Sequence, residues 1–479
     1  MVRSAKAVRG SVVPEYAGAV LGDARRTARV QLVARRLQDD PRTAFPSSLH
    51  STAELEAFYR LVNSSAFGAR DIWEPHRQRT LERAAESETV LVVHDTTAME
   101  FPGRTPRRGL GVTTEGKHGF LAHASLVVCA SATSTPLGVV NLETFTRSGE
   151  KWRETKKTRS KVRDDPARES LRWWRAIEDI EQARAGRFEA IHVMDAEADF
   201  YELLSRMQSE KARFVIRVGQ QQRTLKEGDD DISLRAKADK LKPKAWRTVE
   251  LTSRQYAARA PRSKLQKHPP RDARSAKLAI ASTTIEVKPT KYSTIQSGEV
   301  QLNLVRIWEP KPPKNAPAVE WLLLTSEPAS TRAELMAIVD MYRARWIIEE
   351  FFKALKSGCS IEQRQLDSYD ALQKMLALFI PIAYRLLLLR GMERQRPGAS
   401  PDTGFSAVEL HIMQSHDSTR EMPPMNTLAD ALLYLARMGG HLKNNGPPGW
   451  QTLARGHQRL SGLCAGWEAA KMPKRCDQS

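Results

Sequence analysis

The sequence predicts an α/β protein whose central part carries a β-rich insertion and is flanked by helical N- and C-terminal domains. Three observations support this fold class. Apolar residues recur with helical periodicity over residues 1–70 and again over 371–479. Residues 71–370 hold β-branched runs that alternate with helical segments, as expected of an α/β domain. From about 220 to 312 the pattern changes to short alternating segments, which predicts the insertion.

The composition indicates a globular protein with a polyanionic partner. The chain has 479 residues and is 41% hydrophobic, which is enough for more than one core. Lys and Arg number 75 against 56 Asp and Glu, so the formal charge is +19. Nucleic acid is the commonest partner of such a chain, although an acidic membrane surface would also attract it.

Other features favour a protein of the reducing cytoplasm. The most apolar stretch, MLALFIPIAYRLLLLR, is interrupted by Pro381 and Arg385 and is too short to span a membrane, so we expect a buried helix. The basic N-terminus lacks a continuous apolar run, and we expect no signal peptide. The four cysteines form no CxxC pair, which predicts neither a zinc site nor a disulfide framework.

The N-terminal segment LGDARRTARVQLVARRLQ predicts a helix that Asp23 caps. Arg25, Arg26 and Arg29 lie on neighbouring turns of this helix. Two interpretations stay open: the arginines form an ordinary solvated face, or they grip the phosphates of a nucleic acid.

Two predicted strands end in aspartate. The run ETVLVVHDTTAMEF reaches Asp95, and FEAIHVMDAEADF reaches Asp195 before a helix follows. Between them, LAHASLVVCASATSTPLGVVNLETF predicts two strands joined by a Thr-Pro-Leu-Gly turn. His94, next to Asp95, either supports that aspartate or simply packs beside the strand end.

The insertion contains a basic segment, RQYAARAPRSKLQKHPPRDARSAK, at residues 254–277. It holds eight Lys and Arg against the single acid Asp272, which predicts an exposed loop. The strand VEWLLLTSEP follows the insertion and leads towards a further helix.

That helix, YRARWIIEEFFKALK, runs from Tyr342 to Lys356 and combines an apolar side with a polar face. At roughly 100° per residue, the polar side chains fall within an arc of about 80°. They are Tyr342, Arg345, Glu349, Lys353 and Lys356. Taken alone, this face is typical of a solvated surface helix.

Carboxylates gathered from distant parts of a chain suit hard cations such as Mg²⁺ and Mn²⁺. Two such ions about 3.5–4 Å apart can activate the attacking oxygen and stabilise the leaving oxygen when a phosphodiester bond is cut. Cationic side chains beside the carboxylates would then hold a nucleic-acid backbone near the metals.

The spacing Tyr342, Arg345, Glu349 and Lys356 resembles the Y-R-E-K signature of DDE transposases of the insertion-sequence-four family. The likeness is closest to the Tn-five type of this family. It extends along most of the chain, because further segments resemble family segments in the same order and at similar spacing. These are LGDARRTAR, HDTTAMEF, DAEAD, RFVIR, WLLLTSEP and YLARMGG.

This resemblance implies an RNase H-like catalytic core on which Asp95, Asp195 and Glu349 hold two Mg²⁺ ions, with Mn²⁺ able to substitute. The insertion would lie between the second and third carboxylates. The side chains implied to contact DNA phosphates near the cut are Tyr342, Arg345, Lys353, Lys356 and Arg217. Trp321 matches a tryptophan that stacks on a flipped base, and its alternative role is that of a core aromatic. Arg25, Arg26 and Arg29 match an end-recognition helix.

The implied activity is that of a DNA transposase in the nucleoid of a bacterial cytoplasm. It would nick the 3′ ends of a transposon in double-stranded DNA, form and resolve a hairpin, and join the ends to target DNA. The implied assembly is a synaptic homodimer, with LADALLYLARMGG in the dimerisation region. The alternative is a non-catalytic DNA-binding relative or an inhibitor of transposition. Ala196, Gln363 and Gln365 replace arginines that are usual in the family, so local DNA contacts are expected to differ.

Overall fold

The computed structural model divides the chain into two compact units. It describes residues 12–103, 107–113, 117–130, 135–147, 168–227, 230–251, 253, 270–289, 293, 295, 298–314, 316–395, 398–416, 424–442 and 448–471. The first unit comprises Met1–Glu88, Asp95–Glu154 and Trp346–Ser479, and the second comprises Thr89–His94 and Thr155–Arg345. The division into three domains made from the sequence stays a prediction.

The first unit is mainly helical. Its N-terminal helical elements are η1 (Val13–Tyr16), α2 (Ala24–Asp39), α3 (Phe45–Ser48), α4 (Thr52–Val62) and α5 (Ala69–Ala84). Its later helical elements are α12 (Trp346–Lys353), the π-helical turn η5 (Ala354–Gly358), η6 (Ile361–Gln363), α13 (Tyr369–Gln395), η7 (Pro401–Thr403), α14 (Ala407–His416), α15 (Leu428–Met438) and α16 (Trp450–Lys471). The Asp23 carboxylate accepts a hydrogen bond from the backbone N–H of Arg25, which confirms the predicted cap of α2.

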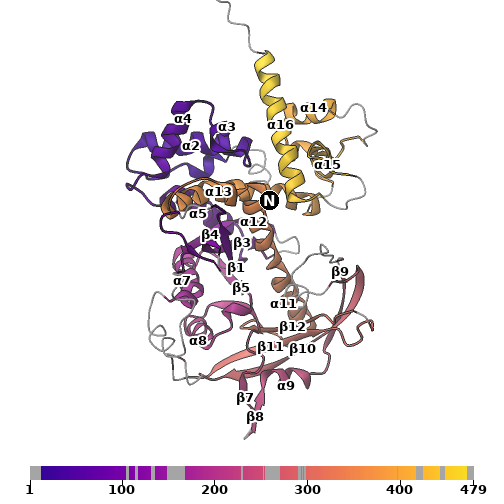
Figure 1. The fold of residues 1–479 in the computed structure, drawn as a ribbon. Coiled ribbons are helices and arrows are strands. Elements are labelled where there is room, and N and C mark those ends of the chain that lie inside the picture. The colour runs from indigo at the N-terminus through magenta and orange to yellow at the C-terminus, as the bar shows by residue number, and fades with distance from the viewer. Residues whose placement is uncertain are drawn as a thin grey trace, which may run out of the picture. The chain divides into compact units, whose positions relative to one another are not determined.

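Helix α13 forms the centre of this unit and packs against α5, α2 and β4 (Figure 1). The segment Tyr369–Gly391 is long and apolar enough to cross a membrane by length and composition, but 89% of its most apolar window is buried inside the protein. The prediction of a buried helix is therefore confirmed. Lys374, also fully buried in α13, donates to the Ser64 carbonyl and pairs with the Asp370 carboxylate at 2.5 Å, so its charge is compensated.

The strands of the first unit are β2 (Gly111–Val112), β3 (His118–Cys129) and β4 (Pro136–Phe145), together with the second half of β1 (Thr89–Glu100). Strands β3 and β4 pair antiparallel, as predicted. The predicted Thr-Pro-Leu-Gly turn is wrong, because Pro136 begins β4 and Gly138 lies inside it. Gly138 has a φ of +143°, and an added Cβ would lie 2.1 Å from Thr80 Oγ1 of α5. This glycine therefore serves close packing of a helix on the strand.

The second unit is built on one mixed sheet. Its strand order is β1-β5-β6-β12-β11-β10-β9. The bounds of these strands are β5 (Glu189–Met194), β6 (Arg213–Arg217), β9 (Ala245–Leu251), β10 (Arg274–Val287), β11 (Val300–Trp308) and β12 (Glu320–Thr325). Strands β1, β5 and β6 are parallel, whereas each pair from β6 to β9 is antiparallel. The carboxyl ends of β1, β5 and β6 therefore meet at one edge of the sheet.

Helices and a small hairpin complete the second unit. They are η3 (Glu169–Leu171), α7 (Arg172–Arg184), η4 (Ala196–Ala198), α8 (Tyr201–Ser209), α9 (Leu234–Asp239), α11 (Arg332–Ala344) and the hairpin of β7 (Thr224–Glu227) and β8 (Asp230–Ser233). Strands β7 to β11 fall within the segment predicted to be rich in strands. Of the predicted basic loop, residues 254–269 lie outside the described residues. Arg274 and Lys277 belong instead to β10, and Arg274 pairs with Glu309 at 2.5 Å.

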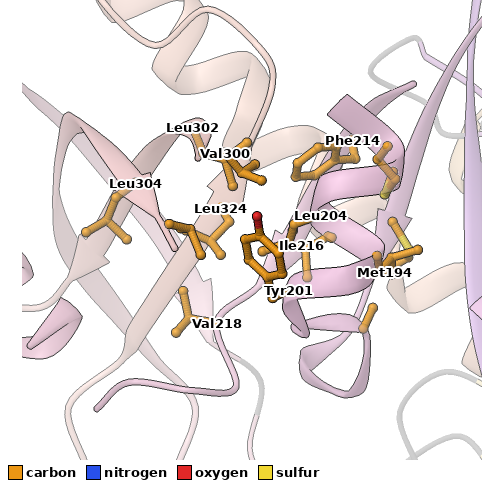
Figure 2. Close-up of a cluster of buried hydrophobic side chains, with 14 of the residues drawn as sticks. Met194, Tyr201, Leu204, Phe214, Ile216, Val218, Val300, Leu302, Leu304 and Leu324 are labelled. Atoms are coloured by element: carbon orange, nitrogen blue, oxygen red, sulfur yellow. The ribbon is translucent and has the colours of Figure 1, made fainter. Parts of the chain in front are cut away.

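The core of the second unit joins the parallel strands to the insertion (Figure 2). Tyr201 of α8 lies between them, and its hydroxyl donates to the Gly298 carbonyl over 2.7 Å. Met194, the last residue of β5, is fully buried in this core. The apolar side chains around it are worth about 1.5–3 kcal/mol each when buried. The backbone at the end of β5 is therefore firmly held just before Asp195.

The helix predicted over residues 342–356 is interrupted twice. Helix α11 ends at Ala344 and α12 begins at Trp346, with the Arg345 N–H bonded to the Tyr342 carbonyl at 3.1 Å. At the other end the Cys359 N–H bonds to the Ala354 carbonyl, five residues back, which is the geometry of a π turn. The five polar side chains therefore do not share one continuous helical face.

Candidate active site and nucleic-acid interface

Asp195 lies at the carboxyl end of β5 and begins the short helical turn η4. Its Oδ1 accepts the Glu197 N–H at 2.9 Å, as in an N-cap. Its Oδ2 makes no hydrogen bond with any described residue. The side chain is half-buried, so one carboxylate oxygen is available to a cation at the edge of the sheet.

The turn after Asp195 is anchored by Asp199, which is buried. Asp199 Oδ2 accepts the backbone N–H groups of Gly219 and Gln220 at 2.8 and 2.9 Å, and Oδ1 accepts Arg223 Nη2 at 2.6 Å. Gly219 is required here, because an added Cβ would lie 2.5 Å from the Ala196 carbonyl oxygen. The end of β6 can therefore lie directly beside the Asp195 turn.

A hollow of about 450 Å³ lies beside this turn. Its lining includes Ala196, Glu197, Asp199, Gly219 and Gln220. Arg168 also lines the hollow, whereas Ala196 contributes no charge to it. The expectation that DNA contacts near Asp195 differ stays a prediction.

Arg217 and Trp321 lie at the same edge of the sheet. Met194 pairs with Ile216 in the parallel register, so Asp195 and Arg217 are the next residues of their strands. Arg217 pairs with Leu323 of β12, two residues after Trp321. Arg217 is exposed and carries its charge to the solvent.

Trp321 packs its ring against Tyr342 of α11. The ring centroids are 5.6 Å apart and the planes are inclined at 63°. Tyr342 is only 6% exposed, whereas Trp321 is half-buried. Tyr342 therefore supports the Trp321 ring, and its phosphate contact stays a prediction. Arg345 follows at the end of α11 and is half-buried.

Asp95 and Glu349 belong to the first unit. Asp95 lies within β1, and its Oδ1 accepts the Thr96 N–H at 2.8 Å. Glu349 lies in the first turn of α12 and is half-buried. Thr96 Oγ1 in turn hydrogen-bonds His123 Nδ1 of β3 at 2.9 Å, which fixes the backbone just after Asp95.

The π turn that follows the helix of Glu349 is bonded to the strand that carries Asp95. Lys356 Nζ donates to the Ala98 carbonyl of β1 and pairs with Glu362 at 3.4 Å. Glu362 also accepts the Glu100 N–H at 3.0 Å. The Lys356 ammonium is thus engaged within the protein, which leaves less of its charge for the predicted DNA contact.

Lys353 and Trp346 form a pair that the sequence reasoning missed in part. Trp346 is 56% exposed, and the Lys353 ammonium lies 5.1 Å from its ring centroid. Lys353 also pairs with Glu350 at 2.8 Å. In the sequence Trp346 reads as one more apolar residue of an amphipathic helix, and only its exposure marks it.

The three N-terminal arginines have different roles. The Arg25 side chain is 91% exposed and pairs with the capping Asp23 at 3.1 Å. Arg26 Nη1 donates to the Leu21 carbonyl at 2.9 Å, and its guanidinium lies over the Phe67 ring. Arg29 is half-buried on α2. Arg25 is therefore the most available to a ligand, and Arg26 also holds the start of the helix.

The proposed metal ligands are distributed over the two units. Asp195 is in the second, and Asp95 and Glu349 are in the first. Within the described part of the chain, no three His, Cys, Asp or Glu side chains lie close enough together to hold a metal ion. The donor set consists of carboxylate oxygens alone, which suits Mg²⁺ or Mn²⁺.

Comparisons with known proteins identify two regions of the chain. The family model of the transposase DDE domain matches residues 172–384, which include Asp195 and Glu349 but not Asp95. The family model described as transposase DNA-binding matches residues 12–67, which include helix α2. Among solved structures, the chain resembles the piggyBac transposase in a cryo-EM structure of its synaptic complex with hairpin DNA. That similarity has 10% sequence identity and a TM-score of 0.36, covers 99% of this chain and 82% of that one, and supports no inference about this chain. The two family matches show that the chain carries a transposase DDE domain and a transposase DNA-binding domain, which indicates a DNA transposase.

Proposed function

We propose that this protein cuts double-stranded DNA at the ends of a transposon and joins the freed 3′ ends to target DNA. The observation that carries the proposal is the placement of Asp195 at the carboxyl end of a parallel strand, inside a matched transposase DDE domain. Ligands of α/β sheets bind at such strand ends. The last residue pair between β1 and β5 is Val93 with Val193, and Asp95 and Asp195 each lie two residues after it.

The three carboxylates are proposed to act together as one metal site. Asp95, Asp195 and Glu349 would hold two divalent ions, Mg²⁺ or Mn²⁺, on an RNase H-like core. Bound there, such ions would supply positive charge to the attacking and the leaving oxygen of a phosphodiester. The bond between Lys356 and β1 supports this arrangement, because it joins the π turn that follows the helix of Glu349 to the strand of Asp95.

The neighbouring side chains are proposed to hold the DNA. Arg217 and Lys353 are exposed and would bind backbone phosphates near the cut, with Arg345 between them in the chain. Trp321, supported by Tyr342, would stack on a base displaced from the duplex. This stacking would favour the bend that a hairpin intermediate requires.

The remaining assignments follow from the DNA-binding match and the resemblance. Helix α2 would recognise the transposon end through Arg25 and Arg29, with Arg26 contributing in part. The C-terminal helices would form the interface of a synaptic homodimer. The protein would act on the nucleoid, in the cytoplasm of a bacterium.

The rival function is that of a DNA-binding relative without catalysis, which would inhibit transposition. Its basic charge and its helix α2 would be the same. The presence of all three carboxylates, with an available oxygen on Asp195, favours catalysis.

The test is a cleavage reaction on the DNA ends that flank the gene. Purified protein, Mg²⁺ and labelled inverted-repeat DNA should yield a nick, then a hairpin, then strand-transfer products. A matched DNA with scrambled ends is the control. Specific end binding without any cleaved product, in Mg²⁺ and in Mn²⁺, would support the non-catalytic relative instead.

A further inference from the structure

A chain of buried hydrogen bonds crosses the second unit behind the aspartates. His94 Nε2 of β1 lies 2.8 Å from His192 Nδ1 of β5, and His192 Nε2 lies 3.2 Å from Glu181 Oε1 of α7. Both imidazoles are completely buried. Glu181 pairs in turn with Arg184 at 2.6 Å. Two strands and a helix are thus joined by polar groups in the core, where unpaired polar groups are costly.

The direction of each hydrogen bond follows from the charge on Glu181. Burial raises the pKa of this carboxyl, but hydrogen bonds and charges from His192 and Arg184 lower it to about 2. Glu181 is therefore ionised and accepts from His192 Nε2–H. His192 Nδ1 is then the acceptor for His94 Nε2–H, so each ring has one defined tautomer in this chain of bonds.

The bonded histidines lie close in sequence to the proposed metal ligands. His94 directly precedes Asp95, and His192 lies three residues before Asp195. In the register, His192 pairs with Val92, the residue two before His94, so both imidazoles lie on the same face of the sheet. Side chains alternate along a strand, so the two aspartates lie on the opposite face. The histidines can therefore hold the strands without contacting the metal site.

We infer that His94, His192 and Glu181 are positioning residues, which fix the ends of β1 and β5 so that Asp95 and Asp195 are held in the geometry that catalysis needs. This inference rests on the proposed function. Apolar side chains would also hold two strands together, but a directed hydrogen bond permits a single register and orientation. A displacement of about 1 Å in a catalytic group is enough to cost on the order of 100-fold in rate.

Leucine substitutions separate positioning from simple packing. His94→Leu leaves the buried His192 Nδ1 without its donor, and His192→Leu removes the bonds to both His94 and Glu181. The double variant H94L/H192L removes both imidazoles and leaves Glu181 its pair with Arg184, so it should recover much of the thermal midpoint. Both single variants and the double variant should cleave about 10- to 100-fold more slowly at saturating DNA, with unchanged end affinity. Glu181→Gln keeps an acceptor for His192 and should retain most of the rate.

His76→Leu is a matched control. His76 is another completely buried imidazole bonded to a carboxylate, Glu15, at 2.5 Å, in the first unit. Its loss should lower the thermal midpoint and leave the cleavage rate below the unfolding range unchanged.

Binding of Mn²⁺, followed by electron paramagnetic resonance, gives a reading that does not depend on cleavage. The histidine variants should bind Mn²⁺ about tenfold more weakly than the wild type and the His76→Leu control. If the double variant recovers both its midpoint and its rate, the histidines are only packing and the inference is wrong. If the wild type binds Mn²⁺ but cleaves no DNA, the proposed function is wrong. The positioning role of the histidines is then decided by whether their variants bind Mn²⁺ more weakly than the wild type. A wild type that neither binds Mn²⁺ nor cleaves DNA overturns both.

Discussion

Trp321 illustrates how a single side chain can be both part of the fold and part of a site. It is the second residue of β12, two residues before the Leu323 that pairs with Arg217 of β6, and its indole contacts the buried Tyr342. The contact with Tyr342 restricts the half-buried ring, which lowers the entropy lost when a base stacks on it. The sequence left two roles open for Trp321, and its partial exposure is compatible with base stacking.

Replacement of Trp321 by alanine should therefore slow hairpin formation more than the first nick. A base stacked on an aromatic ring is worth about 1–3 kcal/mol, and this support is needed only when the DNA is bent. Nicked DNA should accumulate in a time course of cleavage. Trp321→Phe keeps a ring and should restore most of the hairpin product. Equal loss of nick and hairpin in a folded Trp321→Ala protein would contradict this role.

Residue types alone suffice to propose the carboxylates and the aromatic as site residues, but they do not show which partners each cationic side chain has. Lys356 has the same side chain as Lys353, and Arg26 has the same side chain as Arg25. The sequence alone therefore predicts the same role for both members of each pair. The structure separates them, because Lys356 is bonded to Ala98 from a distant strand and Arg26 to Leu21. Such partners depend on tertiary packing, which the local pattern does not contain.

At the scale of elements, helix α2 and its cap were predicted from Asp23 and the helical period, and the structure confirms them. The break at Arg345 and the π turn at 354–358 were not, since an amphipathic period continues through both. The misplaced turn at Gly138 has a similar cause. A glycine can mark a turn or a close approach of two elements, and only the packing of α5 decides between them.

The arginines of α2 should separate into two kinds when each is replaced by glutamine. Arg25→Gln should weaken end binding and reduce the salt slope by about one unit, with no change in thermal midpoint, because a phosphate contact is lost. Arg26→Gln should also destabilise the fold by about 0.5–1.5 kcal/mol, since the Leu21 carbonyl loses its donor. Measurements of DNA affinity against salt, with a thermal melt of each variant, test this. If Arg25→Gln changes neither the DNA affinity nor its dependence on salt, the arginines of α2 form an ordinary solvated face.

The contact between η1 and α5 should make stability depend on pH. Burial raises the pKa of Glu15, but His76 and Arg83 lower it to about 2, below its ordinary 4.5. A carboxyl whose pKa is lower in the folded state stabilises the fold at pH values above its pKa in the unfolded chain. This stabilisation is lost as pH falls from about 4.5 towards 2. Burial lowers the pKa of His76 in spite of Glu15, so charging the unfolded histidine below pH 6.5 acts in the same direction.

The measurement is the thermal midpoint of wild type and Glu15→Gln between pH 7 and pH 3. At pH 7 the variant should be less stable by on the order of 3 kcal/mol, and the difference should shrink in acid. Glu178→Gln, an exposed change on α7, is the control and should follow the wild type. A constant difference across this range would mean that the Glu15 carboxylate is not responsible.

At the scale of the whole molecule, the proposed metal ligands are carried by two compact units, and the chain passes from one unit to the other next to Asp95 and next to Arg345. The strand-end aspartates and the helix glutamate could be recognised from the sequence, because their residue types and spacing survive without a structure. The division into units could not, since it depends on long-range packing such as the contacts of α13 with α5. The formal charge of +19 is consistent with a DNA partner.

The most direct test of this account is single-turnover cleavage of the transposon end by Asp95→Asn, Asp195→Asn and Glu349→Gln in Mg²⁺, alongside end affinity. These variants keep the shape of each side chain and remove its charge. Each should cleave about 10³-fold more slowly or worse, while binding the end as tightly as the wild type and the Glu178→Gln control. Near-normal cleavage by any one of the three would remove that residue from the metal site, and near-normal cleavage by all three would contradict the proposed active site.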